Sequence, residues 1–391
     1  MKIPQSKKTF IFLLAFILVF NFLPSNAKSN FKPPILNPTN LAFNGPIHAI
    51  AIDEMTGIVY VSGEFTKVGE IERSGLAAIG TDGNLTSWNP SVDGVHIPPK
   101  EEGQEVGPYR VINALAISGS TIYVGGVFTS INGMERNNLA AIGTNGILQN
   151  WNPNVSIGYV NALAVKDSIV YIGGEFSTIG GEKRNKLAAV STDGVLQDWN
   201  PDAGMAGGVN ALAIKDSIIY VGGLFNTIEG KIRNNLAAIG TDATLQSWNP
   251  DVSGGYFGST VRTLAIKDST IYAGGDLISM VSMGRGRNNL AAIGTDGILQ
   301  NWNPSVNGSV NTLAINGSII YVGGNFNKIE KKRSIGLAAI GTNGAVKRWN
   351  PNVFGSVRAV LISGSTIYVG GDFTMIGNEV RSRFASFTIP K

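Results

Sequence analysis

The sequence predicts an all-β protein built from one repeated unit, and two observations carry this prediction. Short apolar runs alternate with turns along the chain, and no segment has a helical period. In addition, every tryptophan begins a Trp-Asn-Pro, and the intervals between them are 63, 48, 49, 54 and 47 residues: Trp88, Trp151, Trp199, Trp248, Trp302 and Trp349. A period near 48 residues is typical of propeller blades.

Each repeat contains four segments with the character of short strands. In one repeat they are 209–214 (VNALAI), 218–223 (IIYVGG), 236–240 (LAAIG) and 244–248 (TLQSW). β-branched and aromatic residues favour the extended conformation in these segments. A Thr-Asp-Gly or Thr-Asn-Gly usually joins the third segment to the fourth, because glycine adopts positive φ without strain.

Counting these segments predicts a closed ring. First, second and third strands each occur seven times, but only six fourth strands end in Trp-Asn-Pro. Leu36-Asn37-Pro38 precedes the first repeat, so we expect 31–38 to run antiparallel to 384–387, with Leu36 in the tryptophan position. The N-terminal strand would then complete the last blade and remove the open edges. The prediction is a seven-bladed β-propeller with four antiparallel strands per blade.

The N-terminus has the pattern of a secretory signal peptide. Lys2, Lys7 and Lys8 precede an apolar stretch over 10–20, and small residues follow at Ser25 and Ala27. A retained membrane anchor is the alternative, but the apolar run is shorter than the roughly 20 residues that span a bilayer. We expect a signal peptide over 1–27 and a propeller over 28–391. The mature protein would be secreted, periplasmic or on the cell surface, monomeric and without a membrane span.

Composition narrows the chemistry. The chain has 31 basic and 27 acidic residues, and the leader holds three of the basic ones, so the remainder is nearly neutral. No charge run indicates a nucleic-acid partner. There is no cysteine, and the two histidines are His48 and His96, so disulfides, thiol catalysis and a typical zinc or copper site are not expected. We predict no catalytic residue, metal or cofactor.

An arginine recurs just before each third strand, and the tryptophan recurs at the end of each fourth. The tryptophan should pair with the third-strand leucine and face the next blade. The arginine has two interpretations: a ring of cations for acidic ligands, or a structural residue that binds loop carbonyls or stacks on tryptophan. Recurrence in every blade favours the structural one. The arginines are Arg73, Arg136, Arg184, Arg233, Arg287, Arg333 and Arg381.

The loops of variable length should all lie on one face, where recognition is usual. An insertion over 93–109 and a loop after Trp248 interrupt the repeat there. A polar residue near the start of each first strand should also lie close to the channel mouth on this face: His48, Asn113, Asn161, Asn210, Arg262, Asn311 and Arg358. The candidate ligand-binding residues are His96, Tyr109, Tyr256, Phe257, Arg262 and Arg358.

The diglycine that ends the second strand and the tryptophan on the fourth resemble the pattern of kelch-type propellers. Over residues 31–391 the chain is similar to secreted bacterial propeller repeats of unknown function, which are related to the fungal cortical marker of cell polarity. The resemblance implies the propeller fold and an extracellular setting. It implies no catalytic residue.

These observations favour a non-enzymatic recognition scaffold that binds an unknown protein or glycan through the loop-rich face. One alternative is an extracellular glycan hydrolase or lyase with its site at the central channel. The carboxylates directly after the second-strand glycines, Glu64, Glu175, Asp276 and Asp372, would then be the candidates for acid–base work. The other alternative is a structural component of the cell envelope.

Overall fold

The computed structural model describes residues 31–39, 41–94, 110–204, 207–252, 259–278 and 287–391. Lys32–Lys391 form one compact unit. Strands and turns make up the described residues, in which no helix occurs. No helix long and apolar enough to cross a membrane is present in this described part of the chain. The repeat therefore folds as β-structure throughout these ranges.

A three-stranded antiparallel sheet recurs seven times in the described residues, and in each the second strand of the repeat pairs with both the first and the third. We number the sheets in chain order. Sheet 1 is β2 (Ile47–Ile52), β3 (Val59–Gly63) and β6 (Leu76–Ile79); sheet 2 is β8 (Val111–Ser118), β9 (Thr121–Val127) and β12 (Leu139–Gly143); sheet 3 is β13 (Ile157–Lys166), β14 (Ile169–Ile179) and β16 (Leu187–Ser191); sheet 4 is β18 (Val209–Lys215), β19 (Ile218–Gly223) and β22 (Leu236–Gly240); sheet 5 is β23 (Thr260–Lys267), β24 (Thr270–Ile278) and β25 (Asn288–Gly294); sheet 6 is β26 (Ser309–Asn316), β27 (Ile319–Asn325) and β30 (Leu337–Gly341); sheet 7 is β32 (Val357–Ser363), β33 (Thr366–Gly371) and β36 (Phe384–Thr388).

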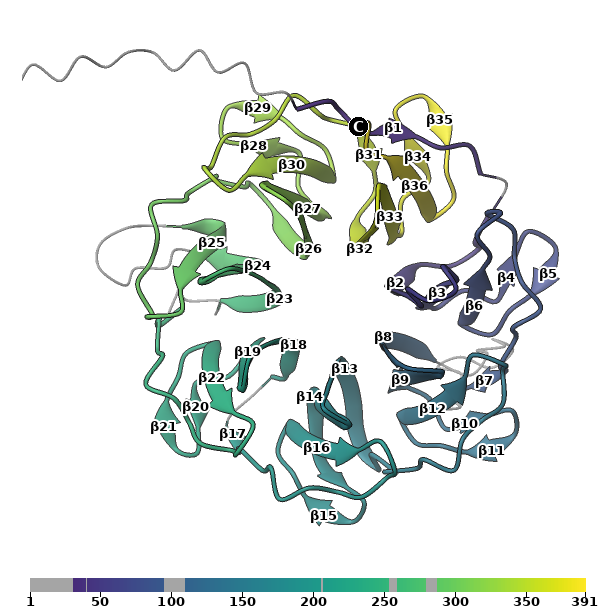
Figure 1. The fold of residues 1–391 in the computed structure, drawn as a ribbon, viewed down its shortest axis with the longest axis vertical. Coiled ribbons are helices and arrows are strands. Elements are labelled where there is room, and N and C mark those ends of the chain that lie inside the picture. Colours follow the sequence, from purple (N-terminus) through teal and green to yellow (C-terminus); the bar gives the residue numbers. More distant parts are fainter. Residues whose placement is uncertain (1–30, 40, 95–109, 205–206, 253–258, 279–286) are drawn as a thin grey trace, which may run out of the picture. The chain divides into compact units, whose positions relative to one another are not determined.

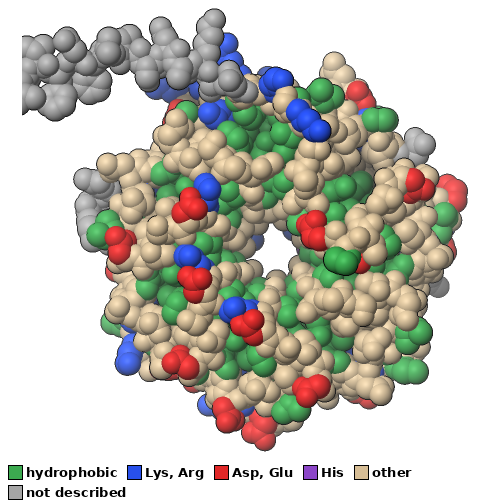
Figure 2. Space-filling model, in the orientation of Figure 1, with side chains coloured by type: hydrophobic (Ala, Val, Ile, Leu, Met, Phe, Trp, Pro, Cys, Tyr) green, Lys and Arg blue, Asp and Glu red, His purple; other side chains and the backbone are tan. Residues whose placement is uncertain are grey.

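The sheets lie side by side around a common centre, with the first strand of each sheet innermost (Figure 1). Figure 2 shows an opening at this centre, with basic and acidic side chains next to one another around it. The innermost strands of successive sheets contact each other, and β2 contacts both β8 and β32. Sheet 1 therefore packs against sheet 2 and against sheet 7.

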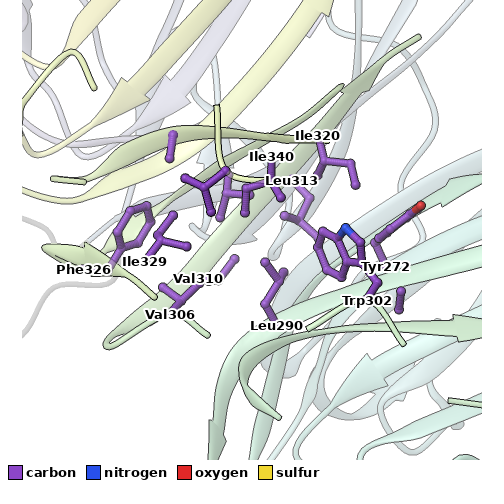
Figure 3. Packing of buried hydrophobic residues seen from close by; sticks show 14 residues of the cluster. Tyr272, Leu290, Trp302, Val306, Val310, Leu313, Ile320, Phe326, Ile329 and Ile340 are labelled. Carbon is purple, nitrogen blue, oxygen red and sulfur yellow. The ribbon is translucent and has the colours of Figure 1, made fainter. Parts of the chain in front are cut away.

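Apolar side chains from two successive sheets form each hydrophobic cluster. Figure 3 shows the cluster in which Tyr272, Leu290 and Trp302 from sheet 5 and the segment after it meet Val310 and Ile320 from sheet 6. The tyrosine and tryptophan rings are edge to face, with centroids 5.0 Å apart. Aromatic side chains bury large areas and prefer this geometry. The core of the protein thus lies between the sheets.

The expected fourth strand is reduced to a single bridge. In the fourth repeat Ile239 is bridged to Leu245, and the main chain then leaves the sheet. Trp248 instead reaches the next sheet, where its Nε1 donates a hydrogen bond to the Gly294 carbonyl at 2.9 Å. A buried indole N–H without a partner costs about 1–3 kcal/mol, which favours this departure over continued pairing. The prediction of a full fourth strand in these repeats is wrong.

The N-terminal strand pairs with the last sheet, as the strand count predicts. β1 (Ile35–Leu36) runs antiparallel to β36, with Ile35 opposite Thr388 and Leu36 opposite Phe387. The Asn37 amide also donates to the Ser386 carbonyl at 2.9 Å. Sheet 7 therefore contains a strand from each end of the described chain.

Leu36 does not occupy the tryptophan position, so that part of the prediction is wrong. It lies opposite Phe387, as Leu148 lies opposite Ile142 in sheet 2. Counting three residues on, the counterpart of Trp151 is Thr39. The Leu-Asn-Pro and Trp-Asn-Pro strings are alike in letters but differ by three residues in register.

Short hairpins follow most second strands, and the sequence did not predict them. A buried Val or Ile and a turn residue with positive φ recur in them, as at Ile131 and Gly133. They are β4 (Lys67–Val68) with β5 (Ile71–Glu72), β10 (Ser130–Ile131) with β11 (Met134–Glu135), the end of β14 with β15 (Glu182–Lys183), β20 (Thr227–Ile228) with β21 (Lys231–Ile232), β28 (Lys328–Ile329) with β29 (Lys332–Arg333), and β34 (Met375–Ile376) with β35 (Glu379–Val380). Three of them also pair with a short strand that leads into a first strand: β7 (Val92–Asp93), β17 (Ala203–Gly204) and β31 (Val353–Phe354). Two others make a single bridge to the same segment, Val68 with Phe43 and Ile329 with Val306.

Candidate functional site

A β-bulge interrupts every first strand at the same place. In sheet 4, for example, Val209 pairs with Gly223 and Ala211 with Gly222, which leaves Asn210 unpaired. A bulge re-aims a side chain and is common next to binding sites. We call the residues at these positions the bulge residues: His48, Asn113, Asn161, Asn210, Arg262, Asn311 and Arg358.

Four bulge residues are asparagines that link neighbouring sheets. The Asn113 amide donates to Asn161 Oδ1 at 3.1 Å, and the Asn161 amide donates to Asn210 Oδ1 at 3.0 Å. The Asn311 amide donates to the Val357 carbonyl at 3.0 Å. These amides satisfy one another and the backbone, as buried or half-buried polar groups generally do.

The three basic bulge residues each pair with the carboxylate that follows the second-strand glycines. The distances from base to acid are 2.8 Å for His48 and Glu64, 2.6 Å for Arg262 and Asp276, and 3.1 Å for Arg358 and Asp372. All three pairs are partly exposed, with the Arg262 side chain 46% accessible.

Sheets 7 and 1 bring two of these pairs together. The hydrogen bond from His48 lowers the pKa of Glu64 below its usual range, and the charge of Arg358 lowers it further. Burial acts in the opposite direction but is a weaker influence than the hydrogen bond. Arg358 of sheet 7 is therefore electrostatically coupled to an acid of sheet 1.

Two of the candidate ligand-binding residues, Arg262 and Arg358, are exposed at the bulges. The other four are His96, Tyr109, Tyr256 and Phe257, and they lie outside the described residues. The signal peptide predicted over 1–27 lies outside them as well.

The recurrent arginines bind main-chain carbonyls. Arg136 donates from Nη1 to the Glu135 carbonyl at 2.8 Å and from Nη2 to the Gln149 carbonyl at 2.9 Å. The second bond ties the hairpin to the segment that carries the tryptophan. A carbonyl thirteen residues further along the chain is likewise the acceptor for Arg73, Arg184, Arg233 and Arg287. Arg381 reaches the corresponding carbonyl of Asn37, at 3.5 Å, in the N-terminal strand.

Arg333 is the exception, and its assignment to the series is wrong. In the other repeats an arginine stands three residues before the first buried residue of the third strand, but before Leu337 this position is Ser334. Arg333 is one residue earlier and exposed on β29. Lys332 donates to the Val346 carbonyl at 3.2 Å, one residue before the carbonyl that corresponds to the acceptor in the other repeats.

A second recurrent group escaped the sequence reasoning. The residue directly before the first buried leucine or phenylalanine of the third strand has positive φ in all seven repeats. It is glycine in two of them, and in the other five its side chain donates to a carbonyl of the segment leading into the next sheet. Asn138 has φ of 65° and donates to the Val155 carbonyl at 2.8 Å. The signal was the second Asn of Arg-Asn-Asn-Leu, since asparagine tolerates the left-handed region. Asn235, Asn289, Lys186 and Arg383 make equivalent bonds.

A pocket of about 430 Å³ opens between sheets 3 and 4. Tyr159 and Glu175 lie at its edge, and the tyrosine hydroxyl donates to Glu175 Oε2 at 2.6 Å. Glu175 is one of the four carboxylates that follow the second-strand glycines. No group of three or more histidine, aspartate or glutamate side chains suited to a metal ion occurs within the described ranges.

Comparison with solved structures supports this architecture. The structure titled "Crystal structure of WD40 beta propeller domain of Doa1" is 14% identical with a TM-score of 0.58, and the match covers 92% of this chain and 98% of the other. "Structure of U3-55K" has 12% identity and a TM-score of 0.55, over 90% and 97% of the two chains. "Crystal structure of RRP9 WD40 repeats" has 10% identity and a TM-score of 0.52, over 92% and 99%.

No protein-family model matches the chain, and no curated protein matches it in sequence. At these low identities the structural likeness defines the fold alone. The chain has a β-propeller fold.

Proposed function

We propose that residues 28–391 form a closed seven-bladed propeller that acts as a secreted or surface-exposed recognition scaffold without enzymatic activity. Its partner is a protein or a glycan, held on the face that carries the bulge residues. Three groups of observations support this proposal: the contacts around the ring, the chemistry of the bulge residues and the state of the carboxylates.

Closure is supported at the junction of sheets 7 and 1. β1 completes sheet 7 beside β36, and β2 contacts β32. Arg383 donates to the Phe43 carbonyl at 2.8 Å, which links the last third strand to the segment before sheet 1. Full closure removes the sheet edges that would otherwise pair with other chains.

The observation that carries the function is the contrast between a uniform frame and a varied ring. The Trp, Tyr and Gly positions repeat almost without change, whereas the bulge residues include His48, Arg262, Arg358 and four asparagines. Varied polar groups presented on a rigid scaffold are the usual arrangement of a recognition surface. We therefore favour recognition over a purely structural role.

The carboxylates on this face favour binding over acid catalysis. A glycosidase acid needs a raised pKa so that it is protonated at working pH. The pKa of Glu64 is lowered instead, and Asp276 and Asp372 are held by arginines at 2.6 and 3.1 Å. Both aspartates are therefore already engaged by basic side chains of the same sheet.

The test is a protein and glycan array probed with the mature domain beginning at Lys28. A double variant, Arg262→Ala with Arg358→Ala, should lose the signal that the parent gives. Lys215→Ala is the control, because Lys215 lies at the opposite end of β18 from the bulge. Binding that the double variant retains and Lys215→Ala removes would overturn the proposal.

Secretion has its own test. The leader would be cleaved after Ala27, so N-terminal sequencing of protein outside the cytoplasm should begin at Lys28. Recovery of the protein with Met1 on the membrane would support the retained anchor.

A further inference from the structure

In sheet 3 the first two strands continue beyond the bulge. β13 has 10 residues and β14 has 11, whereas β18 and β19 of the next sheet have 7 and 6. The continuation pairs Tyr159 with Glu175 and Ile157 with Thr178. It projects an aromatic ring, a carboxylate and an apolar side chain from one short piece of sheet, and Ile157 is 63% exposed.

Glycines allow the main chain to approach closely beside this extension. Gly158 has φ of 102°, and a Cβ on it would lie 1.9 Å from the Glu175 carbonyl oxygen. On the other side, a Cβ on Gly208 would lie 2.9 Å from the Gly174 carbonyl oxygen. Sheet 4 thus approaches sheet 3 at backbone distance, and the pocket of about 430 Å³ lies beside this contact. That volume is within the range of small-ligand sites, roughly 300–1,000 Å³, and accommodates a long side chain with part of its backbone.

The walls of the pocket suit the two parts of a basic side chain. Ile157, the Tyr159 ring and Phe176 offer apolar surface for an aliphatic stem. Glu175 offers a carboxylate, and the Tyr159 hydroxyl fixes its Oε2 while Oε1 keeps its own acceptor sites. A cation held against both the carboxylate and the tyrosine ring gains from each.

Glu175 also differs from the three acids at the same position in other sheets. Glu64, Asp276 and Asp372 each have a basic partner at the bulge. The bulge residue beside Glu175 is the neutral Asn161, whose amide is directed to Asn210. Within the described residues no ion pair involves Glu175, and Lys186 in the pocket wall donates instead to the Ala203 carbonyl at 3.0 Å.

We propose that this pocket binds a lysine or arginine side chain of an extended protein segment. The stem lies along Ile157 and Tyr159, and the cation pairs with Glu175 in the way that Arg262 pairs with Asp276 within the chain. The proposal rests on the recognition function above and specifies the chemistry of one part of the partner.

The test uses ¹⁵N-labelled mature protein and two tripeptides, acetyl-Ala-Lys-Ala-amide and its norleucine counterpart, which has the same stem without the charge. The lysine peptide should shift the backbone amide signals of Gly158 and Gly207, and the norleucine peptide should not. Glu175→Gln should weaken binding of the lysine peptide roughly two- to fivefold, the scale of an exposed ion pair. Asp216→Asn removes one negative charge from the opposite turn of sheet 4 and should leave the affinity unchanged.

Three results would overturn the pocket: no shift at Gly158 and Gly207, equal shifts with norleucine, or unchanged affinity in Glu175→Gln. If maltotriose shifts these signals and the lysine peptide does not, the ligand of the pocket is a glycan and not a basic side chain. The array separates this failure from that of the scaffold. If array binding requires Arg262 and Arg358 but the lysine peptide does not bind, the recognition function stands and only the pocket proposal fails. If the lysine peptide binds but the array gives no signal, the pocket proposal stands and only the recognition function fails.

Discussion

The junction between sheets 2 and 3 and the junction between sheets 7 and 1 solve the same packing problem with different residues. Between sheets 2 and 3, Trp151 fills the gap, with its ring 4.9 Å from Tyr123 and its Nε1 bound to the Ser191 carbonyl at 2.8 Å. Leu139 and Val155 lie in the same cluster.

Between sheets 7 and 1 the tryptophan position is occupied by Thr39, and two neighbours are larger. Phe384 stands where sheet 2 has Leu139, and Phe43 stands where it has Val155. Their rings are 5.9 Å apart, and Phe43 also meets Phe65 at 4.9 Å. The two phenylalanines thus compensate for part of the volume lost at Thr39. Protein interiors tolerate such rearrangements when the total volume is kept. The second difference is connectivity. The chain runs directly from sheet 2 into sheet 3, whereas sheet 7 is joined to the N-terminal segment by the pairing of β1 with β36.

The largest expected effect comes from removing that connection. Deleting 28–40 from the mature chain would remove β1, expose the edge of β36 and take away the buried Pro34. We expect at least about 3 kcal/mol of lost stability, together with aggregation through the open edge. Thermal unfolding followed with light scattering measures both. The control is a chain that begins at Phe31 and therefore keeps β1. If the 28–40 deletion were as stable as this control, the pairing of β1 with β36 would not contribute to stability.

Next in size is the tryptophan itself. Trp151→Ala should lower the free energy of unfolding by about 3–5 kcal/mol, because it leaves a cavity and removes the indole hydrogen bond to the Ser191 carbonyl. Thr39→Ala, at the matching place of the other junction, should cost at most about 1 kcal/mol, since it loses only the bond from the Leu41 amide to the threonine hydroxyl. Urea unfolding measures the loss of stability in each variant. Equal losses would mean that Thr39 packs as the tryptophan does.

Arg136 and Arg333 should differ in their contribution to stability, by less than Trp151 and Thr39 do. Arg136→Ala should cost about 1–3 kcal/mol, because two carbonyls lose a charged donor. Arg333→Ala should change stability by no more than about 0.5 kcal/mol, since this side chain is exposed on β29. The two urea midpoints form the comparison. A loss in Arg333→Ala as large as that in Arg136→Ala would restore Arg333 to the structural series.

These contrasts separate the features that the sequence predicts from those that it does not. The three-stranded sheets and the pairing of β1 with β36 follow from period and strand count, which are strong signals. The predicted register of Leu36 is wrong because it rests on the match of Leu-Asn-Pro with Trp-Asn-Pro and not on the number of residues between this segment and its partner strand. Arg333 was misplaced for the same reason: the residue type recurred, but its spacing from Leu337 did not.

Other features depend on contacts that the sequence leaves open. The sequence does not predict the bulges, because Asn210 resembles an ordinary strand residue until the pairing of its neighbours Val209 and Ala211 is known. The hairpins were interpreted as loops, since two-residue strands have no period. The pocket beside Glu175 requires the close approach of two sheets at Gly208, which no local pattern encodes.

The smallest expected effect concerns Glu64, where sheets 7 and 1 meet electrostatically. The hydrogen bond from His48 and the charge of Arg358 lower the pKa of this carboxyl in the folded protein. Folding therefore favours the deprotonated form, so the stabilisation is complete above the pKa of the unfolded chain, about 4.3, and disappears as the pH falls through the lower folded value.

Because the side chains of both His48 and Glu64 are partly exposed, solvent screens the pair and the effect should stay below about 1 kcal/mol. Urea midpoints at pH 6 and pH 3 should therefore differ slightly less in Glu64→Gln than in the parent, since glutamine has no proton to gain. Glu70→Gln, on the exposed turn between β4 and β5, serves as the control for loss of one acidic charge. A parent and a Glu64→Gln variant that lose stability equally on acidification, at low salt where the pair is least screened, would show that ionised Glu64 does not stabilise the fold.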